Sequence, residues 1–133
     1  MKLTKKGAIR KCLSMWSKCV RARDGKCLIC GRTEGVMDAH HGVAARANGC
    51  RAHWFMLKNG FQLCFQDHML VHSRIGDKSK LEKWLKLVDE MVSQEEQAEI
   101  IKAKHTVTKY TIEDLEGIYE NLAREYDRIK EMK

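Results

Sequence analysis

Residue types that bind metal ions recur in one order between residues 27 and 72, and they limit the folds open to this chain more than any other feature. Two cysteines separated by two residues and followed by a distant third are typical of a tetrahedral zinc site that joins loops. An adjacent His pair and a second His pair at i, i+4 suit a different site, in which one divalent ion lies beside a free imidazole base. The residues concerned are, in order, Cys27, Cys30, Asp38, His40, His41, Asn59, Cys64, His68 and His72.

The length of 133 residues and the hydrophobic content of 44% indicate a single domain with a modest core. We expect it to consist of a basic N-terminal helix (1–24), a zinc-stabilised core (25–76) and a helical region (77–133). The middle part is rich in Gly, Ala, Asn and Arg, so bound zinc would supply order that burial cannot. No run of about eighteen apolar residues is present, which excludes a membrane-spanning segment. Cysteines spaced for metal binding, and an N-terminus without an apolar signal core, favour the cytoplasm.

Positive charge is concentrated at the N-terminus. Residues 1–32 contain ten Lys or Arg and one acid, which gives +9, and the remaining residues therefore carry −2 of the total of +7. This asymmetry indicates a polyanionic partner, most simply DNA, although a solvated lysine-rich helix face gives the same count. Five basic residues of this segment and of the following loop are candidates for DNA contact, namely Lys18, Arg21, Arg23, Arg46 and Arg51.

Apolar periodicity predicts a mainly α protein with one small β-hairpin. In the N-terminal half we expect a helix over 5–23, strands over 36–40 and 61–63, a loop over 42–58 with a turn at Asn48-Gly49, and a helix over 64–74. In the C-terminal half, helices are expected to start at Ser79-x-x-Glu82, Ser93-x-x-Glu96 and Thr111-x-x-Asp114, and to pack on each other and on the first helix. A strand pair followed by a helix, with His at the end of one strand and along the helix, is a ββα-metal arrangement flanked by helices.

On these residues the chain resembles the HNH endonucleases that carry flanking zinc-knuckle cysteines, over about residues 20–75. Two further segments, 20–24 and 110–116, resemble those of the phage NinG/Rap-type recombination nucleases. The sequence departs from that pattern at Asp67, where the second knuckle of the family usually has a cysteine. It departs again at His40-His41-Gly42, which differs from the Gly-His-Phe of the NinG branch.

This resemblance implies a metal-dependent endonuclease that hydrolyses phosphodiester bonds and leaves 5′-phosphate and 3′-hydroxyl ends. It implies branched recombination intermediates, such as Holliday junctions and D-loops, as substrates, and the cytoplasm of a phage-infected bacterium as the location. Symmetric cleavage of a four-way junction would favour a homodimer. The implied cofactors are Mg²⁺ or Mn²⁺ for catalysis and Zn²⁺ for structure.

Each candidate residue has an expected role. His41 is the general base, because a neutral imidazole can take a proton from water near pH 7. Asn59 either orients His41 or braces the hairpin through its amide. A catalytic ion is expected on His40, His68 and His72, with Asp38 as the alternative to His40. The structural zinc is expected on Cys27, Cys30 and Cys64, with Asp67, Cys50 or a water as the fourth ligand.

Two other functional classes fit parts of the same pattern. In a non-catalytic zinc-binding DNA adaptor, a closed site of Cys27, Cys30, Cys64 and His68 would hold one metal, and the His pair would only pack. A thiol redox protein fits poorly, since no thioredoxin-like βαβ pattern surrounds the two cysteines. Outside the pattern, His53 and His105 are interpreted as surface or packing residues, Trp54-Phe55 as an anchor of the loop, and Cys12 and Cys19 as buried hydrophobic residues of the first helix.

Overall fold

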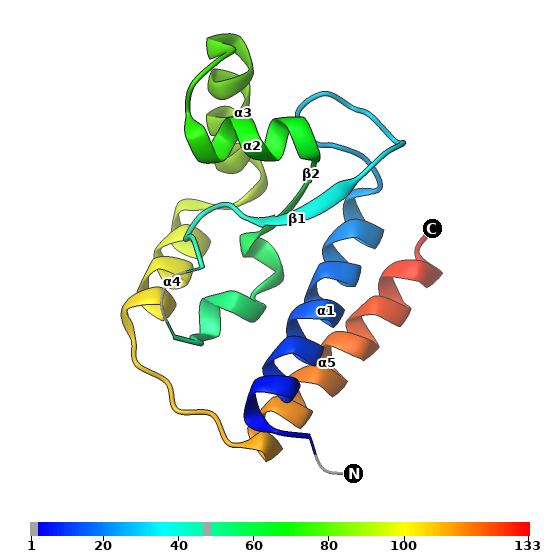
Figure 1. The fold of residues 1–133 in the computed structure, drawn as a ribbon, viewed down its shortest axis with the longest axis vertical. Helices are drawn as coiled ribbons and strands as arrows, with labels where there is room; N and C mark the ends of the chain where they lie inside the picture. Colours follow the sequence, from blue (N-terminus) through cyan, green and yellow to red (C-terminus); the bar gives the residue numbers. More distant parts are fainter. Residues whose placement is uncertain (1–2, 47–48) are drawn as a thin grey trace.

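The structure, a computed structural model, describes residues 3–46 and 49–133. The described residues form five α-helices and a two-stranded antiparallel sheet, which confirms a mainly α protein with a small hairpin (Figure 1). None of the described helices is long and apolar enough to cross a membrane. The helices and strands are α1 (Lys5–Asp24), β1 (Met37–His41), β2 (Gly60–Cys64), α2 (Phe65–Ser73), α3 (Lys78–Met91), α4 (Gln94–His105) and α5 (Ile112–Glu131).

The segment between the strands is more ordered than the expected loop. It contains two 3₁₀ helices, η1 (Ala52–Phe55) and η2 (Leu57–Asn59), the second of which leads directly into β2. The turn expected at Asn48-Gly49 lies partly outside the described residues, because Asn48 is not among them. Phe55 is buried in the same cluster as Ala8 of α1, so this segment is anchored in the core, as expected.

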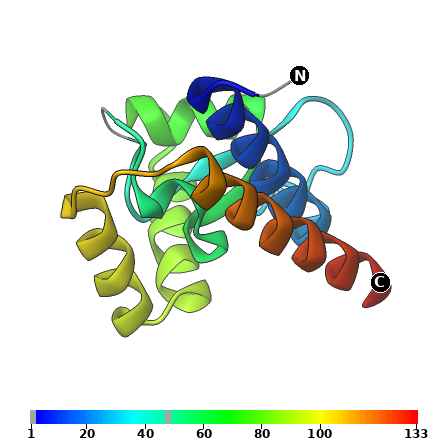
Figure 2. The same cartoon turned by 90° about the horizontal axis from the view of Figure 1, so that it is seen from below.

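α1 and α5 form a parallel pair that runs along one side of the molecule (Figures 1 and 2). Thr4 caps the start of α1, where its hydroxyl accepts a hydrogen bond from the Gly7 N–H, and Gly25, which adopts φ 68°, caps the end. Cys12 and Cys19 are buried on the shared face. Their thiols donate to the carbonyl oxygens of Leu115 (3.1 Å) and Leu122 (3.2 Å) of α5, so both cysteines serve packing.

The hairpin lies between α1 and α2. β1 and β2 pair antiparallel with Met37 opposite Cys64 and His41 opposite Gly60, and every residue of β2 is buried. Gly60 permits a close approach of α1, because a Cβ at this position would overlap Val20 and lie 2.8 Å from Trp16 Cζ2. α2 follows β2 without a loop, and this continuity fixes the direction of α2 relative to the hairpin.

The C-terminal helices divide between two parts of the molecule. α3 joins the core on the hairpin side, where Trp84 packs edge-on against Phe61 at 5.1 Å between ring centroids, and α4 contacts η1. The expectation that the C-terminal helices pack on α1 is therefore confirmed for α5, whereas α3 and α4 make their main contacts with other elements. The capping boxes at Ser93 and Thr111 are confirmed. The start expected at Ser79 is wrong: the cap of α3 lies two residues earlier, at Asp77, whose side chain accepts a hydrogen bond from the Lys80 N–H at 3.2 Å.

Candidate metal centres

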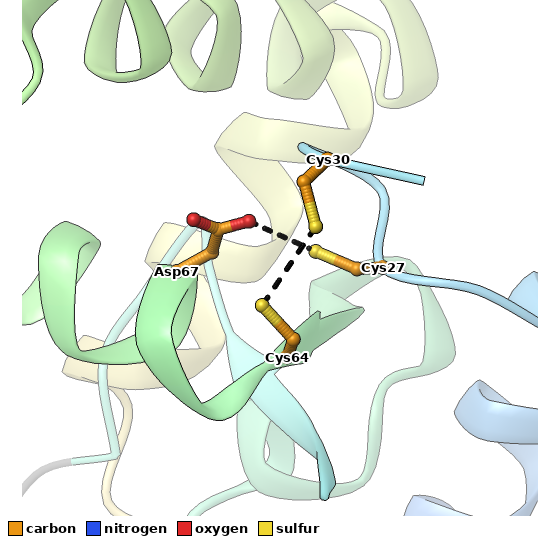
Figure 3. Close-up of side chains that lie close together, drawn as sticks. All are labelled: Cys27, Cys30, Cys64 and Asp67. Carbon is orange, nitrogen blue, oxygen red and sulfur yellow. Dashed lines mark hydrogen bonds between the residues drawn. The ribbon is translucent and has the colours of Figure 1, made fainter. Parts of the chain in front are cut away.

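Three cysteines and an aspartate meet on one side of the hairpin (Figure 3). Their ligand atoms, three Sγ atoms and a carboxylate oxygen, all lie within 4.8 Å of one another. They come from three segments: the turn that follows α1 supplies Cys27 and Cys30, the end of β2 supplies Cys64, and the first turn of α2 supplies Asp67. The first turn is closed by a hydrogen bond of 2.8 Å from the Gly31 N–H to the Cys27 carbonyl, with Gly31 at φ 78°.

The spacing of these atoms fits a tetrahedral ion. Two Zn–S bonds of ~2.3 Å at the tetrahedral angle separate their sulfur atoms by ~3.8 Å, and Cys30 Sγ and Cys64 Sγ lie 3.8 Å apart. The Cys27 thiol donates to Asp67 Oδ2 at 3.2 Å. Three cysteines and one carboxylate could thus hold a metal ion such as zinc. Of the alternatives for the fourth ligand, the geometry favours Asp67, since Cys50 packs instead in the cluster around Cys12.

The surroundings of this cluster are closed. Cys27, Cys64 and Asp67 are buried, and only Cys30 is exposed. Burial raises the pKa of the Cys64 thiol to about 11, whereas a bound cation has the opposite effect, because a coordinating thiol is deprotonated. Burial also acts to raise the pKa of Asp67, but hydrogen bonds from Lys80 (Nζ to Oδ1, 3.0 Å) and from the thiols outweigh it and lower that pKa.

Three histidines form a second cluster at a separate position on the hairpin and α2. The ligand nitrogens of His40, His68 and His72 lie within 4.8 Å of one another. His68 Nε2 and His72 Nε2 are 3.0 Å apart, which is the spacing of adjacent ligands around an octahedral ion with bonds of ~2.1 Å. His40 is nearly buried, whereas His72 is exposed. The cluster offers three donors and opens to one side, so it could hold an ion while leaving coordination positions free.

Asp38 contacts this cluster through His68. Its Oδ2 lies 3.0 Å from His68 Nδ1. A carboxylate only accepts, so His68 carries its proton on Nδ1 and presents the lone pair of Nε2 to the cluster. Asp38 therefore orients a candidate ligand, and the group of three donors contains His40 rather than Asp38. The sequence alone does not reveal this pairing, because the two residues lie thirty positions apart on different elements.

His41 points to the opposite face of β1 from His40, where it stacks on the indole of Trp16 from α1. The two rings are 4.0 Å apart and inclined by 8°. His41 Nε2 lies 3.0 Å from the Trp54 carbonyl oxygen, which can only accept. The proton is therefore on Nε2, and Nδ1 keeps a free lone pair. Burial lowers the pKa of His41 to about 4, so the ring is neutral at pH 7.

A cavity of about 430 Å³ connects these groups. Strand β1 and helices α1 and α2 supply most of its wall, and Arg46 stands at its edge with the guanidinium 5.1 Å from the Trp54 ring. Trp16, a buried residue of α1, is thus also part of the site, and no local pattern marks it. The lining residues are Leu13, Trp16, Ser17, Ala39, His40, His41, Ala45, Arg46, His68 and His72.

Asn59 is fully buried and braces the segment that follows β1. Its Oδ1 accepts from the N–H groups of Val43 and Ala44 at 2.9 Å each, and its Nδ2 donates to the carbonyls of Ala44 (2.9 Å) and His53 (3.2 Å). Within the described residues it makes no hydrogen bond to His41. Of the two roles expected for Asn59, the geometry thus favours the bracing role.

The basic candidates differ in what they contact. Arg23 is held by the chain itself, through Asp24 and the carbonyls of Leu57 (2.9 Å) and Gly60 (2.6 Å). Arg51 donates to the Lys104 carbonyl at 2.8 Å. The remaining candidates are exposed: Lys18 and Arg21 on α1, and Arg46 at the cavity.

The isolated histidines behave as packing and surface residues. His53 is buried and donates from Nε2 to the Ala45 carbonyl at 3.1 Å, while His105 is exposed at the end of α4. His68 belongs to the histidine cluster, so the closed Cys₃His set expected of an adaptor does not form, and Asp67 takes that place beside the cysteines. Comparisons of the chain with protein-family models, with curated proteins and with solved structures give no match.

Proposed function

We propose that this protein is a metal-dependent DNA endonuclease of the HNH type, in which the hairpin and α2 are the ββα-metal core and the Cys₃Asp cluster is the zinc knuckle. One observation carries the proposal: three histidines able to hold an ion and a neutral His41, whose Nε2 is occupied by a backbone carbonyl, line the same cavity. A general base needs a free lone pair at a fixed position, and this arrangement supplies it.

In this proposal His41 accepts a proton at Nδ1 from the attacking water. The water oxygen forms a bond to phosphorus, the bond from phosphorus to the 3′ oxygen breaks, and the 3′ oxygen takes a proton from solvent. Mg²⁺ or Mn²⁺ held by His40, His68 and His72 would act as a Lewis acid toward the phosphate and the leaving oxygen. Trp16 fixes the ring plane of His41 and stabilises the imidazolium produced, because the face of an indole attracts a cation.

The substrate is assigned from charge and from resemblance. The +9 charge of residues 1–32 supports a nucleic-acid substrate. The preference for branched DNA, such as Holliday junctions and D-loops, follows from the resemblance to NinG/Rap-type nucleases alone, and so does a homodimer acting on a four-way junction.

The test is cleavage of a plasmid and of a synthetic four-way junction in Mg²⁺ or Mn²⁺ by the unaltered protein and by His41→Ala. Loss of a positioned base should lower the cleavage rate by about 10²–10⁴-fold, with the circular dichroism spectrum and metal content unchanged. His105→Ala is the matched control, since this exposed histidine lies outside the site and its removal should leave cleavage intact.

Each outcome decides between functions. Cleavage by His41→Ala at the unaltered rate would remove His41 as the base. Retained DNA binding with one bound metal and no cleavage by the unaltered protein would point instead to the non-catalytic zinc adaptor.

A further inference from the structure

One face of α1 combines the cavity wall with positive charge. Leu13 and Ser17 line the cavity. Lys6, Arg10 and Arg21 share their stripe, because positions 6, 10, 13, 17 and 21 are separated by three or four residues and so lie on the same side of a helix. The stripe therefore carries cations both before and after the point where α1 meets the cavity.

Arg10 and Arg21 flank the cavity almost symmetrically. They are eleven residues apart, which corresponds to ~16 Å along the helix axis, and the midpoint between them falls between Leu13 and Ser17. Successive phosphates of one DNA strand are ~3.4 Å apart along the duplex, so the separation spans about five nucleotide steps. Both side chains are exposed, and Arg21 Nε donates to the Ser17 carbonyl at 3.3 Å, which draws the guanidinium back along α1 toward Ser17.

No acidic residue offsets this charge on α1. The only acid of the helix is Asp24, whose carboxylate is engaged by Arg23 and by the Gln62 N–H at 2.9 Å. Among the described residues, Arg10 has no salt-bridge partner. Arg46, which lines the cavity, adds to the same positive field.

We propose that one DNA strand lies along α1, with phosphates on either side of the cavity held by Arg10 and Arg21 and the phosphate to be cleaved over the histidines between them. The inference rests on the proposed nuclease function and specifies how its substrate is aligned. Phosphate contacts of this kind position a strand without reading its sequence.

Two lysines outside this stripe supply a matched control. Lys11 of α1 lies toward α5, with its ammonium 4.2 Å from the centroid of the Tyr119 ring. Lys130 of α5 lies in the same way over the Tyr126 ring, with its ammonium 5.2 Å from the ring centroid. Both pairs remove two positive charges when neutralised, but only Arg10 and Arg21 share a stripe with the cavity-lining residues.

The experiment compares Arg10→Gln/Arg21→Gln with Lys11→Gln/Lys130→Gln, both in a His41→Ala background that prevents cutting. Binding of a fluorescein-labelled duplex is followed by anisotropy between about 50 and 200 mM NaCl. The arginine pair should weaken binding by about tenfold or more and should reduce the slope of log K against log salt by about two, one for each phosphate contact. The lysine pair should leave the slope unchanged, and circular dichroism confirms that both variants are folded.

An equal loss in both pairs, or a loss in the lysine pair alone, overturns the alignment, and so does a protein that does not bind DNA. Failure of the proposed nuclease function gives a different result. If the unaltered protein cleaves DNA with Mg²⁺ or Mn²⁺ but the arginine substitutions do not weaken DNA binding, only the proposed alignment is wrong. If the unaltered protein does not cleave DNA but the two pairs differ in salt dependence as predicted, α1 is a DNA-binding surface and the nuclease function is wrong.

Discussion

The two clusters of potential metal ligands differ in burial and in the number of donors. The Cys₃Asp cluster has four donors from three segments and is almost entirely buried, with Lys80 holding the outer oxygen of Asp67. The histidine cluster has three donors from β1 and α2, includes the exposed His72, and faces a cavity. Structural zinc sites are closed and catalytic sites keep a position open. In the proposed function, this difference would let one short core use one ion for its own stability and another to bind a ligand.

The Cys₃Asp cluster adds to the apolar packing of this part of the chain. The turn over residues 27–31 is a short irregular segment between α1 and β1; Ile29 is buried in the core, and the Leu28 N–H donates to the Gln62 carbonyl of β2 at 3.0 Å. An ion held by the cluster would join this turn more firmly to β2 and α2. The histidine cluster needs no such effect, because pairing with β2 and the helical repeat already position its residues.

Cys64→Ser should change the protein most, because it removes a ligand of the Cys₃Asp cluster. Removing one ligand should release zinc and lower the free energy of unfolding by about 5 kcal/mol or more, a large part of the stability of a small domain. Zinc content by mass spectrometry and thermal melting by circular dichroism measure both effects. Cys50→Ser is the control, because Cys50 lies outside the cluster. A Cys64→Ser protein with unchanged zinc content and melting temperature would show that the cluster is not a structural metal site.

A smaller effect, confined to the histidine cluster, is expected from Asp38→Asn. An amide in place of the carboxylate weakens the hydrogen bond that orients His68, and such a change typically costs about 10–100-fold in metal affinity. Titration with Mn²⁺, followed by calorimetry or by electron paramagnetic resonance, measures the change, while the zinc content, measured before Mn²⁺ is added, should stay constant. The control is Asp127→Asn on the exposed side of α5. Loss of zinc from Asp38→Asn in the absence of Mn²⁺ would mean that Asp38 also supports the Cys₃Asp cluster.

Asp67→Cys should change metal binding least, because it completes a set of four cysteines around the same position. Zinc should be retained against a competing chelator dye at least as well as in the unaltered protein, because thiolates are good zinc ligands. Lys80 loses its partner, but its side chain is 40% exposed, so water solvates its ammonium group once the carboxylate is absent. Mn²⁺ binding at the histidines should not change. Weaker zinc retention would show that the position requires an oxygen ligand.

Local patterns predict the elements of this fold closely. Apolar periodicity places the first helix over 5–23, against Lys5–Asp24 in the structure, and the strands over 36–40 and 61–63, against Met37–His41 and Gly60–Cys64. The i, i+4 spacing of His68 and His72 is enough to put them on one face of α2. These features depend on neighbours in sequence, which is why they can be read without a structure.

The contacts that complete the site are long-range, and local patterns do not contain them. Trp16 looks like an ordinary core position of the first helix, yet it stacks on His41 twenty-five residues later. Asp38 looks like a ligand but pairs with His68. Asn59 looks like a turn residue or a partner of His41 but holds the backbone of Val43 and Ala44. In each case the sequence identifies the residue as a site candidate or as apolar. Its role depends on a tertiary contact that the sequence does not show.

The order of residues on α2 has a thermodynamic consequence. Asp67 and His68 are consecutive, so neighbouring residues of one helical turn belong to the two different clusters. If an ion at the cysteines fixes the start of α2 and thereby raises the affinity of the histidines for their ion by some factor, linkage requires the second ion to raise the affinity for zinc by the same factor. Because α2 is short and carries a ligand for each ion on successive residues, such coupling would make the binding of the two ions cooperative. A chelator that removes the ion from one cluster would then lower the metal affinity of the other.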